Sequence, residues 1–270
     1  MELSIIIVSF NARADLERCL ASLHRHPPAT PHEIIVVDNQ SVDGSADAAR
    51  GWDGVRVIEA GGNLGFARAN NVGIRASRGA NLLLLNSDTI VPLGAVDRLV
   101  EQLQRDGTVA VVGPRLVNAA GEVELSFGRM MGPFNELRQK MLVRGHAKRI
   151  GVITAMVKRM TNRPRFPGWV SGACLLVRRD DADAVGLLDE RYFMYAEDVD
   201  FCAAIRARGR RVRFTPAATV THLRGRSAAT ARAATDAAYR RSQLAFYDKH
   251  HPGWAPLLRW YLRVRGITPG

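Results

Sequence analysis

Short apolar runs alternate with amphipathic segments through residues 1–115. The runs LSIIIVSF (3–10), EIIVVDN (33–39), VRVIEA (55–60), NLLLLNSD (81–88) and VAVVGP (109–114) are nearly continuous, as in strands whose two faces are both buried. Helices are predicted between them at 12–26, 45–50, the later part of 61–77 and 92–103, where Pro92 opens the last helix. This alternation predicts an α/β fold with a mostly parallel, doubly wound sheet.

The pattern loosens after residue 115. Residues 135–160 predict a helix or a helix pair, and GWVSGACLLVRR (168–179) predicts a strand. A helix ending near Arg208, a strand at 211–215 and a basic helical tail at about 230–265 complete the expected elements. We therefore expect one large domain followed by a C-terminal helical extension.

Polar residues stand at or just past four of the predicted strand ends: Asn11, Asp38, Asn63 and Asp88. In an open α/β sheet, ligands bind outside the carboxyl ends of the strands, so these residues are candidates for one site. A dinucleotide-binding domain would need a glycine-rich turn after the first strand, and the turn here is SFNARAD. The glycine string GGNLG follows the third strand instead, which argues against a nicotinamide enzyme.

Composition changes this picture mainly through charge. The 270-residue chain has ordinary hydrophobic (47%) and charged (24%) fractions, but its net charge is +12. The excess is concentrated at 129–165, where Glu136 is the only acid, and again from Arg206 onward. A basic surface of this kind suits an anionic partner such as phospholipid, a phosphorylated substrate or nucleic acid. The basic segment 135–160 fits a packed helix pair and a membrane-surface helix about equally well.

Localisation is expected to be cytoplasmic. No apolar run approaches the roughly 18 residues that span a bilayer. The N-terminus MELSIIIVSF lacks a basic region and is interpreted as a strand rather than a signal peptide. Three widely spaced cysteines without a C-x-x-C pair suggest core residues in a reducing compartment.

The stretch FMYAEDVDF (193–201) places Glu197, Asp198 and Asp200 in an apolar, aromatic run. Buried carboxylates need partners, water or a chemical role. Asp198 is a candidate general base, with the N-cap of the following helix as the alternative. Asp200 either contacts a substrate or pairs with Arg206 or Arg208.

Asp88 ends four consecutive leucines and is a candidate ligand for a hard divalent cation, Mg²⁺ or Mn²⁺. The alternative is a strand-end aspartate that caps a turn. His222, in VTHLRG, is a candidate second ligand, although a lone histidine is more often structural.

Seven motifs in order resemble those of inverting nucleotide-sugar glycosyltransferases of the GT-A fold, and more narrowly the rhamnosyltransferase-like branch of family 2. They are VSFN (8–11), VVDNQSVDGS (36–45), NLGFARANNVGI (63–74), LLLLNSDT (82–89), WVSGACLLVRR (169–179), LLDERYFMYAEDVDFC (187–202) and VTHLRGRS (220–227). The resemblance extends over residues 3–227.

The resemblance implies a role for each matching residue. It implies that Asp198 is the catalytic base, that Glu197 orients it or the acceptor, and that Asp88 and His222 hold the metal. Asn86 and Ser87 depart from the family's D-x-D pattern, which leaves a single strong ligand there, and Gln40 departs at a position where relatives often have Asn or Ser. The residues implied for the nucleotide sugar are Val8, Ser9, Asn11, Asp38, Asn63, Gly65, Asn70 and Ser87, and those for the acceptor are Trp169, Gly172 and Asp200.

The resemblance also implies a division of the chain and a reaction. Residues 1–115 would form the nucleotide-binding half, 116–228 the acceptor and catalytic half with a basic helical insert at about 130–165, and 229–270 a basic helical extension. The expected donor is dTDP-L-rhamnose, with UDP-sugars as the alternative. The expected acceptor is a saccharide, in particular a lipid-linked saccharide of cell-envelope polysaccharide synthesis at the inner membrane face.

Two further classes stay open from the sequence. A nucleic-acid-binding protein is suggested only by the pI of about 10.5, and no basic recognition motif accompanies it. A degenerate transferase that serves as a binding or scaffold subunit is permitted by the thin metal motif. Asp198 and His222 argue against the second class, and no nucleic-acid partner is expected.

Overall fold

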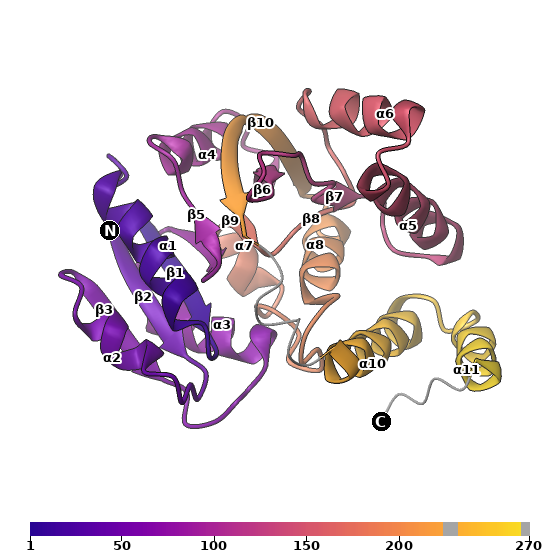
Figure 1. The fold of residues 1–270 in the computed structure, drawn as a ribbon, viewed down its shortest axis with the longest axis horizontal. Coiled ribbons are helices and arrows are strands. Elements are labelled where there is room, and N and C mark those ends of the chain that lie inside the picture. Colours follow the sequence, from indigo (N-terminus) through magenta and orange to yellow (C-terminus); the bar gives the residue numbers. More distant parts are fainter. Residues whose placement is uncertain (224–231, 266–270) are drawn as a thin grey trace.

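The computed structural model describes residues 1–223 and 232–265 (Figure 1). The strands are β1 (Leu3–Ser9), β2 (His32–Asp38), β3 (Val55–Glu59), β4 (Asn81–Asn86), β5 (Thr89–Ile90), β6 (Val109–Val117), β7 (Phe127–Gly128), β8 (Trp169–Val170), β9 (Cys174–Arg178) and β10 (Arg211–His222). The helices are α1 (Arg13–Arg25), α2 (Ser45–Arg50), α3 (Phe66–Ala76), α4 (Ala95–Gln104), α5 (Pro133–Ala147), α6 (Gly151–Thr161), α7 (Arg179–Ala184), α8 (Glu197–Ala207), α10 (Arg232–His250) and α11 (Ala255–Val264).

In the described part of the chain, eight strands form one sheet in the order β3-β2-β1-β4-β9-β6-β10-β5. Strands β3, β2, β1 and β4 pair in parallel, and so do β6 and β10. Strand β9 is antiparallel to both of its neighbours, and β5 is antiparallel to β10. The expected mostly parallel sheet is confirmed, with an antiparallel strand in its middle that the sequence pattern did not predict.

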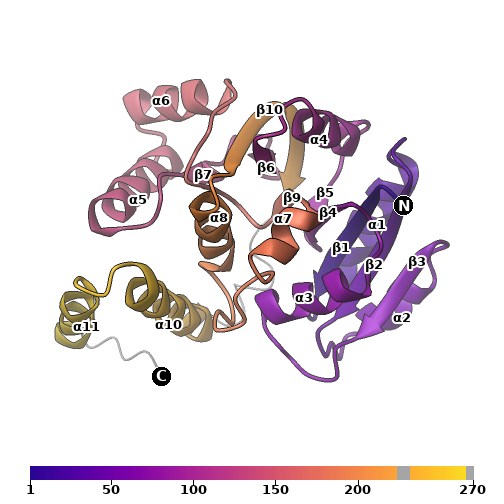
Figure 2. The same cartoon turned by 180° about the vertical axis from the view of Figure 1, so that it is seen from behind.

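Apolar side chains cover both faces of the sheet, which explains the continuous apolar runs. Ile5 and Ile7 of β1 belong to a cluster that includes α1 and α4, whereas Ile6 between them belongs to a cluster that includes α3 and α8. Successive strand residues point to opposite faces, so one strand contributes to both clusters. Figures 1 and 2 show the sheet from its two sides, with these helices around it.

Three predicted elements differ from the structure. The helix expected from Pro92 begins at Ala95, because Gly94 has a φ of +68°, which a right-handed helix cannot include. The strand expected at 168–179 is two strands: β8 pairs with β7 in a separate two-stranded sheet, and β9 enters the main sheet. The strand expected at 211–215 continues as β10 to His222.

The C-terminal half adds helices at one end of the molecule. Residues 135–160 form a helix pair, α5 and α6, separated near Arg149, whose φ is +55°. Helices α5, α6, α10 and α11 lie at the end away from β3 and α2 in both views (Figures 1 and 2). None of the described helices combines the length and the hydropathy that crossing a bilayer requires. The predicted boundary at residue 228 and the end of VTHLRGRS lie outside the described residues.

Candidate active site

The ends of β1, β2 and β4 bring the predicted nucleotide-binding residues to one edge of the sheet. Ser9 is in register with Asp38, and Val8 is in register with Asn86. Asn11, just past β1, receives a hydrogen bond at Oδ1 from the Val42 N–H (2.8 Å), which joins the loops after β1 and β2. The ends of these three strands therefore lie at one edge of the sheet, and a shared ligand site there stays a prediction.

Asp38 has one carboxylate oxygen engaged and one without a partner. Oδ2 accepts a hydrogen bond from the Ser41 N–H (2.9 Å), whereas the buried Oδ1 has no hydrogen-bond partner among the described residues. The Ser9 hydroxyl beside it is in the same state. Buried polar atoms are normally paired, so these atoms are available to a ligand's polar groups.

The loop after β3 is held against the loop after β2 by amide side chains. Asn39 donates from Nδ2 to Asn63 Oδ1 (2.9 Å), and Gln40 accepts at Oε1 from the Asn63 N–H (3.1 Å). Gln40, which the sequence marked as a departure from the family pattern, therefore takes part in positioning Asn63. Further along, Asn70 in α3 is 1% exposed, and its Oδ1 has no hydrogen-bond partner within the described chain.

Gly65 joins this loop to the segment before α8. Its φ is +80°, and the Phe66 N–H next to it donates to the Phe193 carbonyl (2.7 Å). A Cβ at residue 65 would lie 2.4 Å from the Phe193 oxygen, which is too close for any side chain. Gly65 is therefore required for the close approach of residues 193–196 to the start of α3. These are the four residues that directly precede Glu197.

Substituting Gly65→Ala should lower the free energy of unfolding by about 2–6 kcal/mol, because backbone strain and overpacking each cost about 1–3 kcal/mol. Gly61→Ala is the matched control: its φ is +73°, but a Cβ there has nothing within 4 Å. Chemical denaturation of both variants measures the difference. Equal destabilisation would show that the Phe193 contact adds nothing to the backbone strain.

Asp88 and His222 are brought together by the antiparallel pairing of β5 with β10. His222 is in register with Thr89, and the Leu223 N–H donates to the Asp88 carbonyl (2.8 Å). His222 Nε2 lies 3.2 Å from Asp88 Oδ1, so the two predicted metal ligands meet although 134 positions separate them in the sequence numbering. Ser87 lies half-buried in the turn between β4 and β5.

Glu124 is a site residue that the sequence analysis missed. Its Oε2 lies 3.5 Å from His222 Nδ1, on the other side of the ring from Asp88. Burial lowers the pKa of His222, but the contacts with Asp88 and Glu124 outweigh it and raise the pKa to about 9. The segment around Glu124 has no periodic pattern to mark it. Its N–H donates to the Leu116 carbonyl of β6, and β10, which pairs with β6, brings His222 to it.

The residues around Asp88 have the donor chemistry of a divalent-cation site. Besides the Asp88 carboxylate and His222 Nε2, the buried Asn86 Oδ1 has no hydrogen-bond partner in the described residues. Carboxylate and amide oxygens suit Mn²⁺ or Mg²⁺, and such ions commonly take their remaining ligands from substrate phosphates and water. Among residues 1–223 and 232–265, no group of three or more His, Cys, Asp or Glu residues is arranged to hold a metal ion alone.

Asp198 stands in the first turn of α8 with both carboxylate oxygens engaged by backbone. Oδ2 accepts from the Gly172 N–H (2.8 Å) and Oδ1 from the Val199 N–H (2.8 Å). The N-cap of α8 is Ala196, with a φ of +67°, so the N-cap interpretation of Asp198 is wrong. Gly172 positions this carboxylate through its backbone N–H, and its predicted acceptor contact stays a prediction.

Burial raises the pKa of Asp198 above the usual range of an aspartate, although the two backbone N–H groups oppose the rise. The pKa of Glu197 is also raised, first by burial and then by the neighbouring Asp198 charge. Glu197 is 7% exposed, and its Oε2 has no hydrogen-bond partner among the described residues. Asp198 is therefore a candidate proton acceptor, and the Glu197 carboxyl group is its neighbour.

The segment of Gly172 and Ala173 connects Asp198 to the end of β4. Gly172 donates to Asp198, and the carbonyl of Ala173 accepts from the Asn86 N–H (3.0 Å). A Cβ at Gly172 would also lie 3.5 Å from the Phe66 ring at the start of α3. The candidate base, the start of α3 and the end of β4 therefore converge on this glycine.

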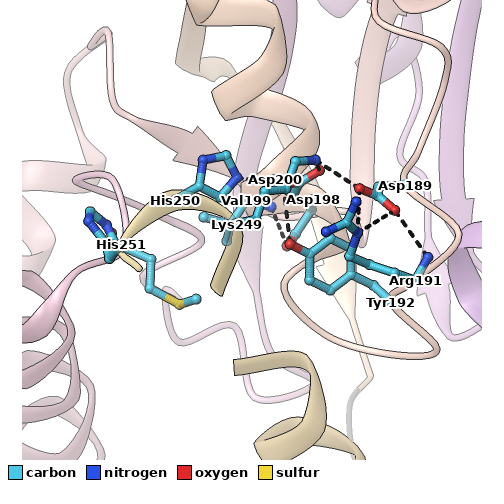
Figure 3. A network of polar contacts seen from close by, with 10 residues as sticks. Asp189, Arg191, Tyr192, Asp198, Val199, Asp200, Lys249, His250 and His251 are labelled. Carbon is cyan, nitrogen blue, oxygen red and sulfur yellow. Dashed lines mark hydrogen bonds and ion pairs between the residues drawn. The ribbon is translucent and has the colours of Figure 1, made fainter. Parts of the chain in front are cut away.

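Asp200 lies in a network of polar contacts with residues of α10 (Figure 3). It is 2% exposed and accepts from Tyr192 Oη (3.2 Å), Lys249 Nζ (2.9 Å) and His250 Nε2 (2.6 Å). Its ion-pair partners are therefore Lys249 and His250 rather than Arg206 or Arg208. These contacts favour the structural role for Asp200, since they join α8 to the C-terminal extension.

Trp169 is also held by protein contacts. Its Nε1 donates to the Arg129 carbonyl (2.9 Å), and its ring packs on Gly128, where a Cβ would lie 2.8 Å away. Its ring is half-buried, between the sheet cluster and the cluster that joins α8 to α10. An acceptor contact by Trp169 stays a prediction.

Comparison with known proteins gives a consistent result. Residues 4–163 match the model of glycosyl transferase family 2. An N-acetylglucosaminyl-diphospho-decaprenol L-rhamnosyltransferase of Mycobacterium tuberculosis is 31% identical over an aligned length of 275 residues, which covers 97% of this chain and 89% of that protein.

Two solved structures share the fold at 17% identity. The mannosyltransferase PcManGT from Pyrobaculum calidifontis, in complex with GDP-Man and Mn²⁺, has a TM-score of 0.63 over 96% of this chain and 68% of its own. GalNAc-T7 with UDP, GalNAc and Mn²⁺ has a TM-score of 0.62 over 83% of this chain and 44% of its own. The GT-A fold expected from the motifs is confirmed.

Proposed function

The chain belongs to glycosyl transferase family 2, and from this membership we propose that it is an inverting, metal-dependent transferase that moves L-rhamnose from dTDP-L-rhamnose to a lipid-linked saccharide. The observation that carries the proposal is the position of Asp198. It has a raised pKa and is held by the Gly172 N–H, next to strand ends whose buried polar atoms have no hydrogen-bond partner among the described residues.

An inverting transfer is a single displacement at the anomeric carbon, and the acceptor hydroxyl must lose its proton. Asp198 would accept that proton, and its raised pKa makes it a better base than a solvated carboxylate. The backbone contacts from Gly172 and Val199 fix its orientation before the acceptor arrives. Glu197, whose Oε2 has no described partner, would position the acceptor or Asp198.

The nucleotide would occupy the ends of β1 and β2. Asp38 Oδ1 is a buried acceptor without a partner in the described chain, which suits the ring N–H of a thymine or uracil base. The Ser9 hydroxyl and Asn70 Oδ1, in the same state, would bind the remaining polar groups of the nucleotide sugar. The pyrimidine would therefore be recognised by groups that have no hydrogen-bond partner in the described part of the chain.

Asp88 and His222, with Asn86 Oδ1, would hold the divalent cation. When bound, a cation of this kind offsets the negative charge that develops on a departing diphosphate. Protonation of His222 and metal binding compete for Nε2, so the cation would displace the proton that the Asp88 and Glu124 contacts favour.

The relative from M. tuberculosis supports the sugar and the acceptor, because its name specifies L-rhamnose transfer to a lipid diphosphate saccharide. The proposed location is the cytoplasm, in line with three free and buried cysteines, Cys19, Cys174 and Cys202. A UDP-sugar is the alternative donor, since the groups that would read the base do not distinguish thymine from uracil.

The test is release of nucleoside diphosphate from a panel of dTDP-, UDP- and GDP-sugars with Mn²⁺ or Mg²⁺. A lipid-linked saccharide extract serves as acceptor, and reactions without acceptor report simple hydrolysis. We expect dTDP-L-rhamnose to turn over in the presence of acceptor and metal. Turnover of another donor alone would replace the proposed sugar.

A catalytically degenerate binding subunit is the second candidate, favoured by Asn86 and Ser87, which leave Asp88 as the single strong ligand of the D-x-D position. It predicts donor binding by calorimetry but no turnover with any donor or acceptor. If no donor binds at all, the transferase assignment of this chain fails.

A further inference from the structure

Helix α11 carries apolar side chains on two faces. One face packs inward, with Ala255 and Leu262 each 1% exposed. The other carries Leu257, Trp260, Tyr261 and Val264, with exposures of 52%, 60%, 44% and 66%. Their spacing of i, i+3, i+4 and i+7 aligns them in one stripe along the helix. A stripe with two aromatic residues is thus left on the surface.

Helices α5 and α6 extend this apolar surface. Phe134 of α5 is 78% exposed and makes an edge-to-face contact with Trp254, next to the start of α11, with ring centroids 6.2 Å apart. Leu137 and Met141 follow on the same face of α5 at exposures of 59% and 61%, and they line a shallow groove with Phe134, Arg138, Leu142 and Ile153. On α6, Val152 and Met156 are also exposed.

Basic residues surround the apolar side chains. The exposed ones on or beside these three helices are Arg144, Lys148, Arg149, Lys158, Arg159, Arg163, Arg259, Arg263 and Arg265. Of this set, only Arg149 and Arg259 have carboxylate partners among the described residues, Glu122 and Asp248. The surface therefore combines an unpaired positive charge with apolar and aromatic side chains.

We propose that the surface formed by α5, α6 and α11, termed the helical docking surface, binds the interface of an anionic lipid bilayer. Tryptophan and tyrosine favour the headgroup level of a bilayer, and the neighbouring leucine, valine and phenylalanine side chains enter the acyl boundary. Arginine and lysine around them contact anionic headgroups. None of the described helices spans a membrane, so the protein attaches by lying on its surface.

The charge and the apolar stripe together favour an anionic bilayer over a second copy of the chain and over nucleic acid. A second copy of the chain would bring the same basic residues face to face, and their repulsion opposes a symmetric contact. Nucleic acid would engage the arginine side chains but would leave Leu257 and Val264 exposed, since aliphatic side chains gain nothing from phosphates. An anionic bilayer satisfies both the charge and the apolar stripe.

The helical docking surface is connected to the candidate active site through α10. Lys249 and His250 bind Asp200 of α8, and the Ser242 hydroxyl donates to the Met194 carbonyl in the segment before α8 (2.7 Å). The proposed docking would therefore hold α8, which carries Asp198, close to the membrane surface. Membrane binding by this surface requires neither a particular donor sugar nor turnover.

The experiment is flotation of the full chain with vesicles of phosphatidylcholine and phosphatidylglycerol in equal parts, and with phosphatidylcholine alone. We expect binding to the anionic vesicles at low salt, and weaker binding as salt rises. The triple variant Leu257→Ser, Trp260→Ser, Val264→Ser should bind at least about tenfold more weakly, because the inserted side chains are lost. The charge variant Arg144→Glu, Lys148→Glu, Arg263→Glu should lose binding similarly.

The control is Leu93→Ser, an equally exposed leucine (67%) before α4, which should bind like the unmodified protein. Absence of wild-type binding to anionic vesicles at low salt would overturn the proposal, and so would undiminished binding by the triple variant. A concentration-dependent dimer that the triple variant abolishes, without flotation, would assign the surface to a second copy. Because transfer to a water-soluble acceptor should be unchanged in the triple variant, failure of docking is distinguishable from failure of the transferase function.

Discussion

Replacing Asp198 with Asn is expected to lower kcat by about 10³-fold, within the range of about 10²–10⁴-fold that a positioned general base contributes. The amide has the shape of the carboxylate, and its one oxygen can still accept from the Gly172 N–H while the Val199 N–H loses its acceptor, so the fold should be kept and the donor affinity should change little. The loss should therefore appear in kcat, because the missing proton acceptor acts only when the acceptor hydroxyl attacks.

The measurement is steady-state release of nucleoside diphosphate together with donor affinity from calorimetry. Asp180→Asn on α7 is the matched control, since it makes the same chemical change at an exposed site. An Asp198→Asn variant that retains kcat within about tenfold would remove Asp198 from the role of base.

The same assignment fixes the direction of the pH dependence. The base must be deprotonated, and its raised pKa means that activity is lost as pH falls through a value above the ordinary aspartate pKa of about 4. A kcat/KM profile should therefore have its acid limb above that value. An acid limb at or below about 4 would contradict the raised pKa.

Replacing Asp88 with Asn is expected to lower kcat by about 10²–10³-fold, because the cation that offsets the diphosphate charge would be held less well. His222→Ala should have an effect in the same direction, since the two side chains lie 3.2 Å apart. If both side chains hold one cation, the double variant should be only slightly less active than the less active of the two single variants. Independent roles would instead give additive losses in the free energy of activation.

Chelation provides the control for this prediction. With chelator present, the unmodified protein should fall to the level of the Asp88→Asn variant, and the variant itself should change little. Binding of Mn²⁺ in the presence of nucleoside diphosphate, followed by electron paramagnetic resonance, gives a readout that does not depend on turnover. Full activity of the unmodified protein in chelator would show that transfer does not need the cation.

Local pattern was sufficient for much of the fold. The continuous apolar runs at 3–10, 33–39 and 81–88 predicted buried strands because burial on both faces leaves no place for polar residues. Parallel pairing then places the ends of β1, β2 and β4 at one edge, so Ser9, Asp38 and Asn86 could be expected close together. The order of the seven motifs gave the family, which the comparisons confirm.

The arrangement of the catalytic half depended on long-range contacts. The pattern of WVSGACLLVRR does not predict that β9 runs antiparallel between β4 and β6. It also does not predict that the Gly172 N–H donates to Asp198. The meeting of His222 with Asp88 and Glu124 requires the full length of β10 and its pairing with β5.

Sequence by itself determined which segments are buried, and therefore the strands, most helices and the strand ends that carry polar groups. Only the tertiary structure decided what those polar groups touch: that Asp200 binds Lys249 and His250 instead of a neighbouring arginine, and that Asp198 is held by Gly172 rather than capping α8. The physical reason is the distance along the sequence between the residues that interact. Burial is recorded in the spacing of adjacent residues, whereas a hydrogen bond between distant segments depends on how every strand and helix between them packs.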